Sequence, residues 1–411
     1  MKFSDLKNLA EKNEVPVDNT KDQKRTPPHF FDSLRDAFAS YFNTFRTNNS
    51  SYESYAMSTS TTKKTQLKIL ESQFLDVENT VSSMVHFQRF FELFIKDLLY
   101  RTNPKLTYSE DKNYSRSGTP WQLIGNIQAK VFRPYKPEGR IISAPFSENL
   151  TRFYALINFT KDPAKLQHPL VRKFSKTLYP YSFLDDDAHR ASLKFINWYR
   201  NKILHSGTRL PSLRFFDYIV SQRIIPLVRQ IRSVTKQEFG DWWYFLETMT
   251  GIDIAESLAS VEFDQTNAKT MKQVNVTFLS LLHIGHLKEL GRANLNMNWL
   301  MRRNLRATFE YNYFDPVGRG IRFAEIEREK NSYARQIASC PCCGIDSMAI
   351  YRHKFNDILN NNQPLNIDWV KCYTCDYYLR YNTGEPAYFK LHKEQLFNRE
   401  FNRVAVQNPI P

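Results

Sequence analysis

Two pairs of cysteines constrain the C-terminal part of this chain more than any other feature. The first pair lies in Cys340-Pro341-Cys342-Cys343-Gly344 and the second in Cys372-Tyr373-Thr374-Cys375. Two residues between thiolates form a tight turn that directs both sulfur atoms at one ion, and two such turns complete a tetrahedral site. We therefore expect one metal ion, with zinc as the default, held by Cys340, Cys343, Cys372 and Cys375.

Two alternatives are open at this site. Cys342 lies inside the first pair, so it is either a free thiol or an alternative ligand, and His353 can also compete. A site closed by four thiolates has no position for water, so the expected role of the metal is structural and not catalytic. All five cysteines of the chain fall in this window. Their spacing indicates metal ligation in a reducing compartment and not a disulfide framework.

The segment from about residue 338 to 385 resembles zinc ribbons. The resemblance rests on both cysteine pairs and on the aromatic, strand-like sequence Tyr377-Tyr378-Leu379-Arg380-Tyr381 after the second pair. It implies a small β module that zinc stabilises. Two functions are open for this module. It is either a scaffold or protein contact, or a platform for the phosphates and bases of nucleic acid, built from its tyrosines and from Lys371, Arg352 and Arg380.

The charge of the chain favours polyanions as partners. The formal net charge is +15 and the pI is near 9.4. Such a field attracts nucleic acid first and anionic membranes second, although many basic proteins gain only solubility from it. No apolar run approaches the roughly 18 residues that span a bilayer, and the first residues lack the apolar stretch of a secretory signal. We expect a cytoplasmic protein without a membrane partner.

Apolar periodicity predicts a mainly α fold with a small β zinc ribbon at its C-terminal end. Apolar side chains recur every three or four residues over 30–45 and over 67–100, as in amphipathic helices, and Asn103-Pro104 ends the second helix. Residues 105–165 are rich in Tyr, Ser, Gly and Pro, and we expect irregular structure and short strands there. Helical patterns resume over 188–205 and 211–232, which predicts a helical hairpin with Gly207 at its break.

These patterns divide the chain into four parts. Residues 1–64 form an N-terminal arm with an amphipathic helix and a polar linker at 48–64, and the helix must dock on the main domain or on a partner subunit. A helical bundle spans 65–235 with an insertion at about 105–165. A basic helical region spans 236–336, and the ribbon and tail span 337–411.

Two clusters in the basic helical region can have either a functional role or a purely structural one. Arg302, Arg303 and Arg306 form either a solvated face or contacts for RNA phosphates. His283, His286 and Glu289 follow one another at steps of three residues, which turns Glu289 about 120° away from His283 on a helix. We expect these three to be core or surface residues and not metal ligands.

A polar trio, Arg200, Asn201 and His205, lies at the end of the helix expected from about residue 188. Asn201 and His205 share one face, so the amide can bond the imidazole and fix its tautomer. Arg200 and His205 are about 140° apart around the helix and about 7.5 Å apart along it, so they do not easily converge on one phosphate. Two copies that meet along this edge would bring Arg200 of one copy to His205 of the other, which predicts a homodimer. The alternative without catalysis is a solvated arginine and a histidine that the helix dipole favours at the C-terminal end of the helix.

The pattern Arg-Asn-x-x-x-His at a helix end resembles the HEPN superfamily of ribonucleases over about residues 65–235. The upstream segment 90–99, which contains Glu92, resembles the first helix of HEPN bundles. The resemblance implies metal-independent attack of a ribose 2′-hydroxyl on the adjacent phosphate, with a 2′,3′-cyclic phosphate and a 5′-hydroxyl as products. It implies His205 as general acid or base, Arg200 as the group that neutralises phosphorane oxygens, Asn201 as the orienting residue and Glu92 as its support.

The expected function is therefore an endoribonuclease that cuts RNA. HEPN bundles joined to accessory modules occur in toxin and anti-phage abortive-infection systems, so we expect a phage-derived or other regulatory trigger. The alternative is a non-catalytic zinc-ribbon protein that binds nucleic acid and uses its helical bundle only for dimerisation.

Overall fold

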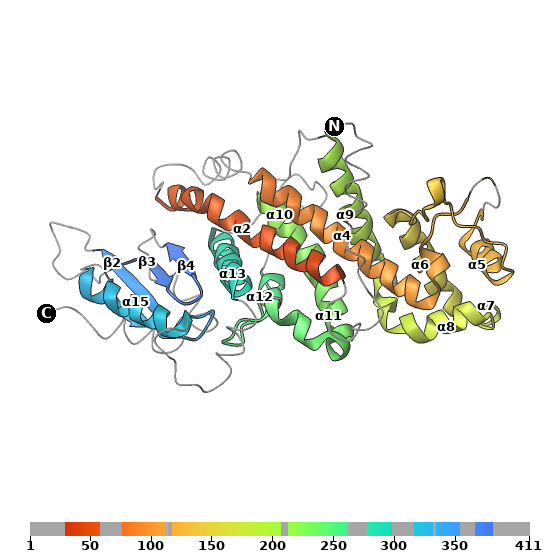
Figure 1. Ribbon diagram of the computed structural model, residues 1–411. Helices are drawn as coiled ribbons and strands as arrows, with labels where there is room; N and C mark the ends of the chain where they lie inside the picture. Colours follow the sequence, from red (N-terminus) through yellow and green to blue (C-terminus); the bar gives the residue numbers. More distant parts are fainter. Residues whose placement is uncertain are drawn as a thin grey trace.

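A computed structural model describes residues 29–57, 76–111, 113, 117–206, 213–261, 263, 278–297, 316–331, 334–353 and 366–380. This described part is mainly helical, with a small antiparallel sheet of four strands at its C-terminal end. The predicted fold class is thus confirmed. In Figure 1 the sheet lies at one end of the molecule, the long helices fill the middle, and α5 to α8 form the other end.

The helix of the N-terminal arm is part of the central core. Helix α2 (His29–Met57) packs against α4 (Val77–Thr102) and α13 (Phe278–Asn296). Its apolar stripe is buried, as the periodicity predicts: Phe30, Phe31, Leu34, Phe38, Tyr41, Phe42 and Phe45. The arm therefore docks on the main body of its own chain. The linker prediction is wrong for residues 48–57, because α2 continues through them once its first turns are packed.

Helix α4 begins and ends where its capping residues require. The Asp76 side chain accepts a hydrogen bond from the backbone N–H of Asn79 and so satisfies a donor of the first turn. The helix ends at Thr102, and Pro104 cannot continue it. The predicted end is confirmed. Residues 67–75 lie outside the described part.

The segment 105–165 contains more helix than its composition predicts. After the short helical turn η1 (Pro104–Thr107) come α5 (Pro120–Gln128), the turn η2 (Pro137–Gly139) and α6 (Phe146–Thr160). The prediction of irregular structure is therefore wrong for α5 and α6. Thr119 starts α5 through a capping box with Gln122, a local signal that the surrounding Gly and Pro residues obscure.

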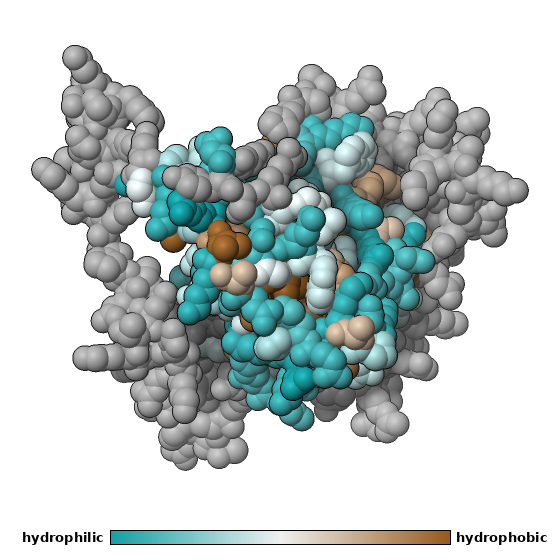
Figure 2. Space-filling model, turned by 90° about the vertical axis from the view of Figure 1, so that its right-hand side faces the viewer, coloured by the Kyte–Doolittle hydropathy of each residue, from teal (hydrophilic) through white to brown (hydrophobic). Residues whose placement is uncertain are grey.

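Three further helical pieces complete this end of the molecule: α7 (Pro163–Leu166), α8 (Pro169–Leu178) and η3 (Tyr179–Asp185). Figure 2 faces this end, and hydrophilic residues cover most of it, with hydrophobic residues in small separate patches. The exposed apolar side chains of this part include Trp121, Val131, Ile141 and Ile142. Scattered apolar residues of this kind are normal on a solvated surface.

Both helices of the predicted hairpin are present. Helix α9 (Asp187–Ser206) is followed by α10 (Leu213–Ile219), a π-helical turn η4 (Val220–Ile224) and α11 (Ile225–Phe239), and these last three form one continuous run. Pro226 lies in the first turn of α11 and has no N–H to donate to the preceding turn, which accounts for the wider π-helical hydrogen bonding before it. The turn η5 (Gly240–Leu246) and α12 (Ile254–Ala259) lead on toward α13.

The C-terminal sheet lies between α13 and α15 (Pro316–Lys330). Its strands are β1 (Ala334–Ala338), β2 (Met348–His353), β3 (Asn366–Cys372) and β4 (Tyr378–Arg380), in that spatial order. Alternate side chains face opposite sides of the sheet. One face contributes Met348, Ile350, Val370 and Leu379 to the same buried core as the helices. The C-terminal sheet and the helical body therefore share one core.

Candidate functional site

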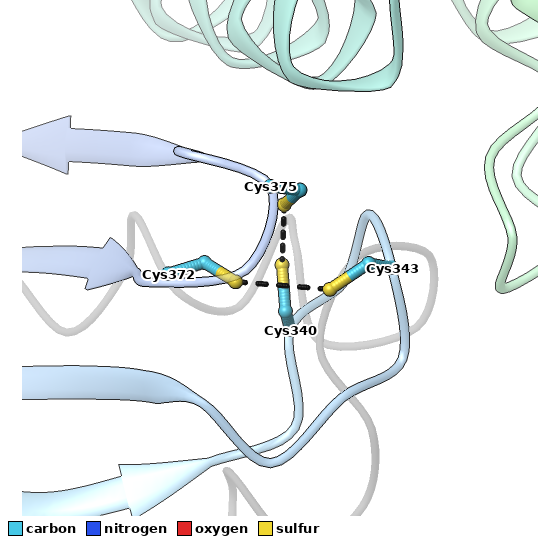
Figure 3. Close-up of side chains that lie close together, drawn as sticks. All are labelled: Cys340, Cys343, Cys372 and Cys375. Atoms are coloured by element: carbon cyan, nitrogen blue, oxygen red, sulfur yellow. Dashed lines mark hydrogen bonds between the residues drawn. The ribbon is translucent and has the colours of Figure 1, made fainter. Parts of the chain in front are cut away.

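The four paired cysteines come together in one buried cluster (Figure 3). Cys340 and Cys343 lie in the turn after β1, Cys372 ends β3, and Cys375 lies in the turn before β4. All four Sγ atoms lie within 4.8 Å of one another. The closest pairs are Cys340 with Cys375 at 3.5 Å and Cys343 with Cys372 at 3.7 Å. Sulfur atoms that bind one ion tetrahedrally at about 2.3 Å are about 3.8 Å apart, so this cluster has the size that a metal ion requires.

The two turns that present these sulfur atoms have the same backbone. The N–H of Gly344 donates to the carbonyl of Cys340 over 2.8 Å, and the N–H of Asp376 donates to the carbonyl of Cys372 over 3.1 Å. Both residues after the pairs adopt left-handed conformations, with φ of 74° at Gly344 and 59° at Asp376. Glycine adopts this conformation without strain, and aspartate tolerates it better than most residues. The predicted pairs of cysteines are thus matched in local geometry.

Cys342 lies outside the cluster. Its Sγ points to the carbonyl of Leu290 on α13, at 3.8 Å. Its backbone N–H instead contacts the sulfur of Cys340 at 3.4 Å. Of the two alternatives for this residue, the geometry favours the free thiol. The side chain of His353 lies outside the described part.

Burial places four ionisable thiols where isolated negative charge is costly. Burial is the largest influence on Cys340 and Cys375 and raises the pKa of both thiols. The pKa of Cys372 is lowered, because hydrogen bonds from the three other cysteines and from Ser347 outweigh the opposing effect of burial. A bound cation would stabilise all four thiolates together. The donor set and its surroundings therefore suit a metal ion.

Helix α13 holds the second cysteine turn through a buried ion pair. Arg292 donates to both carboxylate oxygens of Glu289, over 2.9 Å and 2.6 Å. Arg292 also donates to the carbonyl of Asp376, and Glu289 accepts the backbone N–H of Tyr378 over 2.8 Å. Both charged side chains are almost fully buried. Sequence reasoning missed Arg292 altogether, because its role depends on a contact between distant parts of the chain.

His283, His286 and Glu289, which the sequence predicts to be core or surface residues, lie in or beside the core. His286 is fully buried and hydrogen-bonds the hydroxyl of Tyr377, and Glu289 is fully buried in the ion pair with Arg292. His283 is half-buried, and burial lowers its pKa. Within the described residues, only the four cysteines form a group of potential metal ligands.

An aromatic cleft opens on the face of the sheet that carries α15. It has a volume of about 600 Å³, and its walls include Tyr351, Trp369, Lys371, Tyr373 and Tyr378. The Lys371 ammonium lies 5.0 Å from the centre of the Tyr373 ring. The structure therefore brings one predicted nucleic-acid contact, Lys371, together with the tyrosines of the predicted platform.

The other predicted nucleic-acid contacts are only partly described. Arg380 ends β4, where its backbone pairs with Trp369, but its side chain lies outside the described part. The same holds for the side chain of Arg352. Arg302, Arg303 and Arg306 lie outside the described residues entirely. These contacts stay predictions.

The end of α9 carries the polar trio. The Arg200 guanidinium donates from Nη1 to the amide oxygen of Asn201 over 2.8 Å, and its buried Nε has no hydrogen-bond partner within the described part. The backbone of His205 lies in the last turn of α9, and its side chain lies outside the described part. Trp198 and Leu204 on the same helix are 54% and 47% exposed. Arg200 and Asn201 are thus adjacent and bonded, on a helix end with exposed apolar neighbours.

Glu92 lies on α4, which packs against α9. Its carboxylate accepts hydrogen bonds from Lys96 over 2.6 Å and from Gln88 over 2.9 Å, all within one helix. Among the described side chains, no hydrogen bond or ion pair joins Glu92 to Arg200 or Asn201. The predicted support of the trio by Glu92 stays a prediction.

No protein-family model, curated protein or solved structure matches this chain. None of the helices in the described part is long and apolar enough to cross a membrane.

Proposed function

We propose that this protein is a metal-independent endoribonuclease of the HEPN type. The observation that carries the proposal is the bonded pair of Arg200 and Asn201 at the end of α9, one turn before His205. A planar guanidinium held by a neighbouring amide is pre-oriented for the oxygens of a phosphate. A histidine can move protons near neutral pH.

In the proposed reaction the ribose 2′-hydroxyl loses its proton to a base and its oxygen attacks the adjacent phosphorus. The bond from phosphorus to the 5′-oxygen then breaks, and that oxygen takes a proton to become a 5′-hydroxyl. His205 transfers a proton in this sequence, and Arg200 neutralises the charge that grows on the phosphorane oxygens. Asn201 orients these groups. Glu92, bonded to Gln88 and Lys96 on the neighbouring helix α4, is the proposed support of the trio.

The proposed enzyme is a homodimer. Positions 200 and 205 are about 140° apart around a regular helix, so in the proposed dimer a second copy supplies the missing partner at each site. Trp198 and Leu204 support this arrangement, because two large apolar side chains on α9 are about half exposed in the single chain. Their burial between two copies would stabilise a dimer along this helix.

The proposed metal in the cysteine cluster is zinc with a structural role. Four thiolates in a tetrahedral arrangement match the donor set that zinc prefers, and they leave no open coordination position. Zinc would hold the two cysteine turns, and the ribbon would in turn offer its aromatic cleft to RNA. The net charge of +15 would attract the RNA strand. Cysteines spaced for a metal and not for disulfides fit a reducing compartment, so we propose the cytoplasm as the place of action.

The biological setting follows from family analogy alone. HEPN-type ribonucleases joined to accessory modules suit toxin or anti-phage abortive-infection systems, in which a trigger releases the nuclease. We therefore propose a regulated ribonuclease that responds to a phage-derived or other signal.

A cleavage assay in EDTA tests the proposed activity. Wild type and His205→Ala are compared on a labelled single-stranded RNA after each protein is shown to keep its metal. His29→Ala is the matched control, because this exposed histidine is the first residue of α2 and so lies on a different helix from His205. We expect cleavage by wild type and His29→Ala and a loss of at least about a hundredfold in His205→Ala. Equal cleavage by all three proteins would disprove the assignment.

A second function has its own supporting observation. The cleft on the ribbon combines aromatic rings with Lys371, while Glu92 is engaged within its own helix. Both facts favour a non-catalytic protein that binds nucleic acid through the ribbon. In that case Lys371→Glu weakens RNA binding and abolishes function, whereas His205→Ala leaves both unchanged.

A further inference from the structure

The aromatic cleft on the ribbon has the dimensions of a small-molecule site. Its volume of about 600 Å³ falls within the range of roughly 300–1,000 Å³ that is usual for ligand sites. Its lining combines flat aromatic rings with an ammonium group and two carboxylates, from Lys371, Glu327 and Asp376. A ligand that fits this lining needs a planar ring, hydrogen-bond donors and a negative group.

The stacking surface is formed by two rings on neighbouring strands. Trp369 lies flat on Tyr351, with ring centres 3.3 Å apart and an angle of 9° between the planes. Tyr351 is buried, whereas Trp369 stays partly exposed and lines the cleft. The ring of Tyr378 flanks Trp369 at 5.8 Å. This rigid pair offers the indole as a platform on which a nucleobase can stack.

The Glu327 carboxylate is fixed beside this platform. Its Oε2 accepts hydrogen bonds from the hydroxyl of Tyr351 over 3.0 Å and from Asn331 over 3.4 Å. Its Oε1 has no hydrogen bond in the described part of the chain. Tyr351 also bonds the hydroxyl of Tyr373 over 2.7 Å, so the carboxylate belongs to an ordered network. The free oxygen, and a remaining lone pair of Oε2, can accept two donors from a ligand.

The other carboxylate is already compensated. Asp376 Oδ2 lies 3.4 Å from Nη1 of Arg292, which carries a positive charge. Lys371 lies on β3 directly opposite Tyr378, at the edge of the stacking surface. The cleft therefore presents one carboxylate for donors and one ammonium for a phosphate.

We propose that this cleft binds a guanine nucleotide of a single-stranded RNA. The base stacks on Trp369, its N1–H and N2–H donate to the Glu327 carboxylate, and Lys371 takes an adjacent phosphate. Guanine alone among the four RNA bases has two adjacent N–H donors on its Watson–Crick edge. Adenine, cytosine and uracil would each direct at least one acceptor at the carboxylate. The inference rests on the proposed function only for RNA as the source of the base, since binding requires no cleavage.

Binding to deoxyadenosine hexamers tests this assignment apart from catalysis. One hexamer carries a single central deoxyguanosine, and a second carries deoxyinosine, which lacks the 2-amino donor. Neither has the 2′-hydroxyl that cleavage needs. We expect the guanine hexamer to bind wild type about tenfold more tightly than the inosine hexamer, the effect of one hydrogen bond to a charged acceptor.

Two amide variants identify the carboxylate. Glu327→Gln keeps an oxygen for the Tyr351 hydroxyl, and it should abolish the preference for guanine over inosine. Asp376→Asn is the matched control, because asparagine tolerates the left-handed backbone of that position and should keep the preference. Metal content and unfolding temperature are checked for both variants.

The possible failures are distinct. Equal affinity of wild type for both hexamers, or a preference that survives Glu327→Gln or disappears in Asp376→Asn, would overturn the guanine assignment. None of these results depends on cleavage. If His205→Ala instead cleaved RNA as well as wild type does, that result would overturn the proposed ribonuclease. It would leave the guanine assignment intact.

Discussion

At the scale of single residues, the cysteine cluster depends on a helix outside the ribbon. Arg292 on α13 donates a hydrogen bond to the backbone carbonyl of Asp376. Asp376 itself closes the second cysteine turn with its left-handed backbone conformation. Glu289 holds Arg292 in place and also accepts the N–H of Tyr378. The geometry of Cys372 and Cys375 is therefore fixed from both the ribbon and the helical body.

Cys375 and Cys342 should respond differently to the same substitution. Cys375→Ser removes one of four thiolate ligands, so we expect metal affinity to fall by at least about a hundredfold and the free energy of unfolding to fall by several kcal/mol. Cys342→Ser should keep the full metal content, because a serine hydroxyl can still face the carbonyl of Leu290. Metal content after gel filtration and thermal unfolding measure both effects. A full complement of metal in Cys375→Ser, or its loss in Cys342→Ser, would contradict the ligand set.

Sequence spacing was sufficient for the cysteine cluster and insufficient for its neighbours. The two pairs determine their own turns, so Cys340, Cys343, Cys372 and Cys375 could be predicted from local pattern alone. The choice between a free thiol and a ligand at Cys342 could not be made from the sequence. It depends on the contact of Cys342 with α13, which lies far away in the sequence. Lys371 could be placed near the tyrosines because β3 and β4 are adjacent, whereas Glu327 comes from α15 and gave no local signal.

At the scale of elements, α13 connects the ribbon to the long helices. Gly291 faces the Phe42 ring on α2, and an added Cβ there would overlap the ring, so glycine permits the close approach of these two helices. Lys288 on the same helix forms an ion pair of 2.5 Å with Asp217 on α10, and both side chains are fully buried. Lys288 also donates to Thr44 over 3.0 Å. One helix thus contacts α2, α10 and the ribbon.

The buried ion pair should be costly to break from one side. Lys288→Ala leaves the Asp217 carboxylate buried without its cation, so we expect a loss of about 3–5 kcal/mol in the free energy of unfolding. The double variant Lys288→Met with Asp217→Leu should recover most of that loss, because two apolar side chains need no partner. Chemical denaturation measures both values. A single variant as stable as wild type would show that the pair is not buried as described.

Long elements could be predicted and short ones could not. Helices α2, α4 and α9 repeat apolar residues over several turns, and their buried stripes match the pattern. Helix α5 has nine residues among Gly and Pro, too few for periodicity to appear above the punctuation. The polar end of α2 has no apolar pattern, so composition suggested a linker where the helix continues.

At the scale of the whole molecule, the C-terminal sheet and the end of α9 belong to one protein body. The apolar side chains of the sheet and of the long helices form a single core, with α13 between the sheet and α2. This arrangement could not be predicted from the sequence, because no local pattern specifies which distant elements pack together. In the proposed function the C-terminal sheet would bind RNA and the end of α9 would cut it.

Mixing two inactive variants tests the proposed dimer. Arg200→Ala and His205→Ala are combined in equal amounts under conditions that allow subunit exchange. If Arg200 of one copy works with His205 of the other, half of the dimers regain one intact site, and about a quarter of wild-type activity returns. No recovery, in a mixture that demonstrably exchanges subunits, would place both residues in one chain.

The most direct measurement is the chemistry of the RNA ends. Wild type is incubated with RNA in EDTA under conditions that keep its metal, and the ends of the fragments are identified by mass spectrometry. We expect 2′,3′-cyclic phosphate and 5′-hydroxyl ends from wild type and none from His205→Ala. Fragments with 5′-phosphate ends, or cleavage that His205→Ala retains, would contradict a HEPN-type ribonuclease.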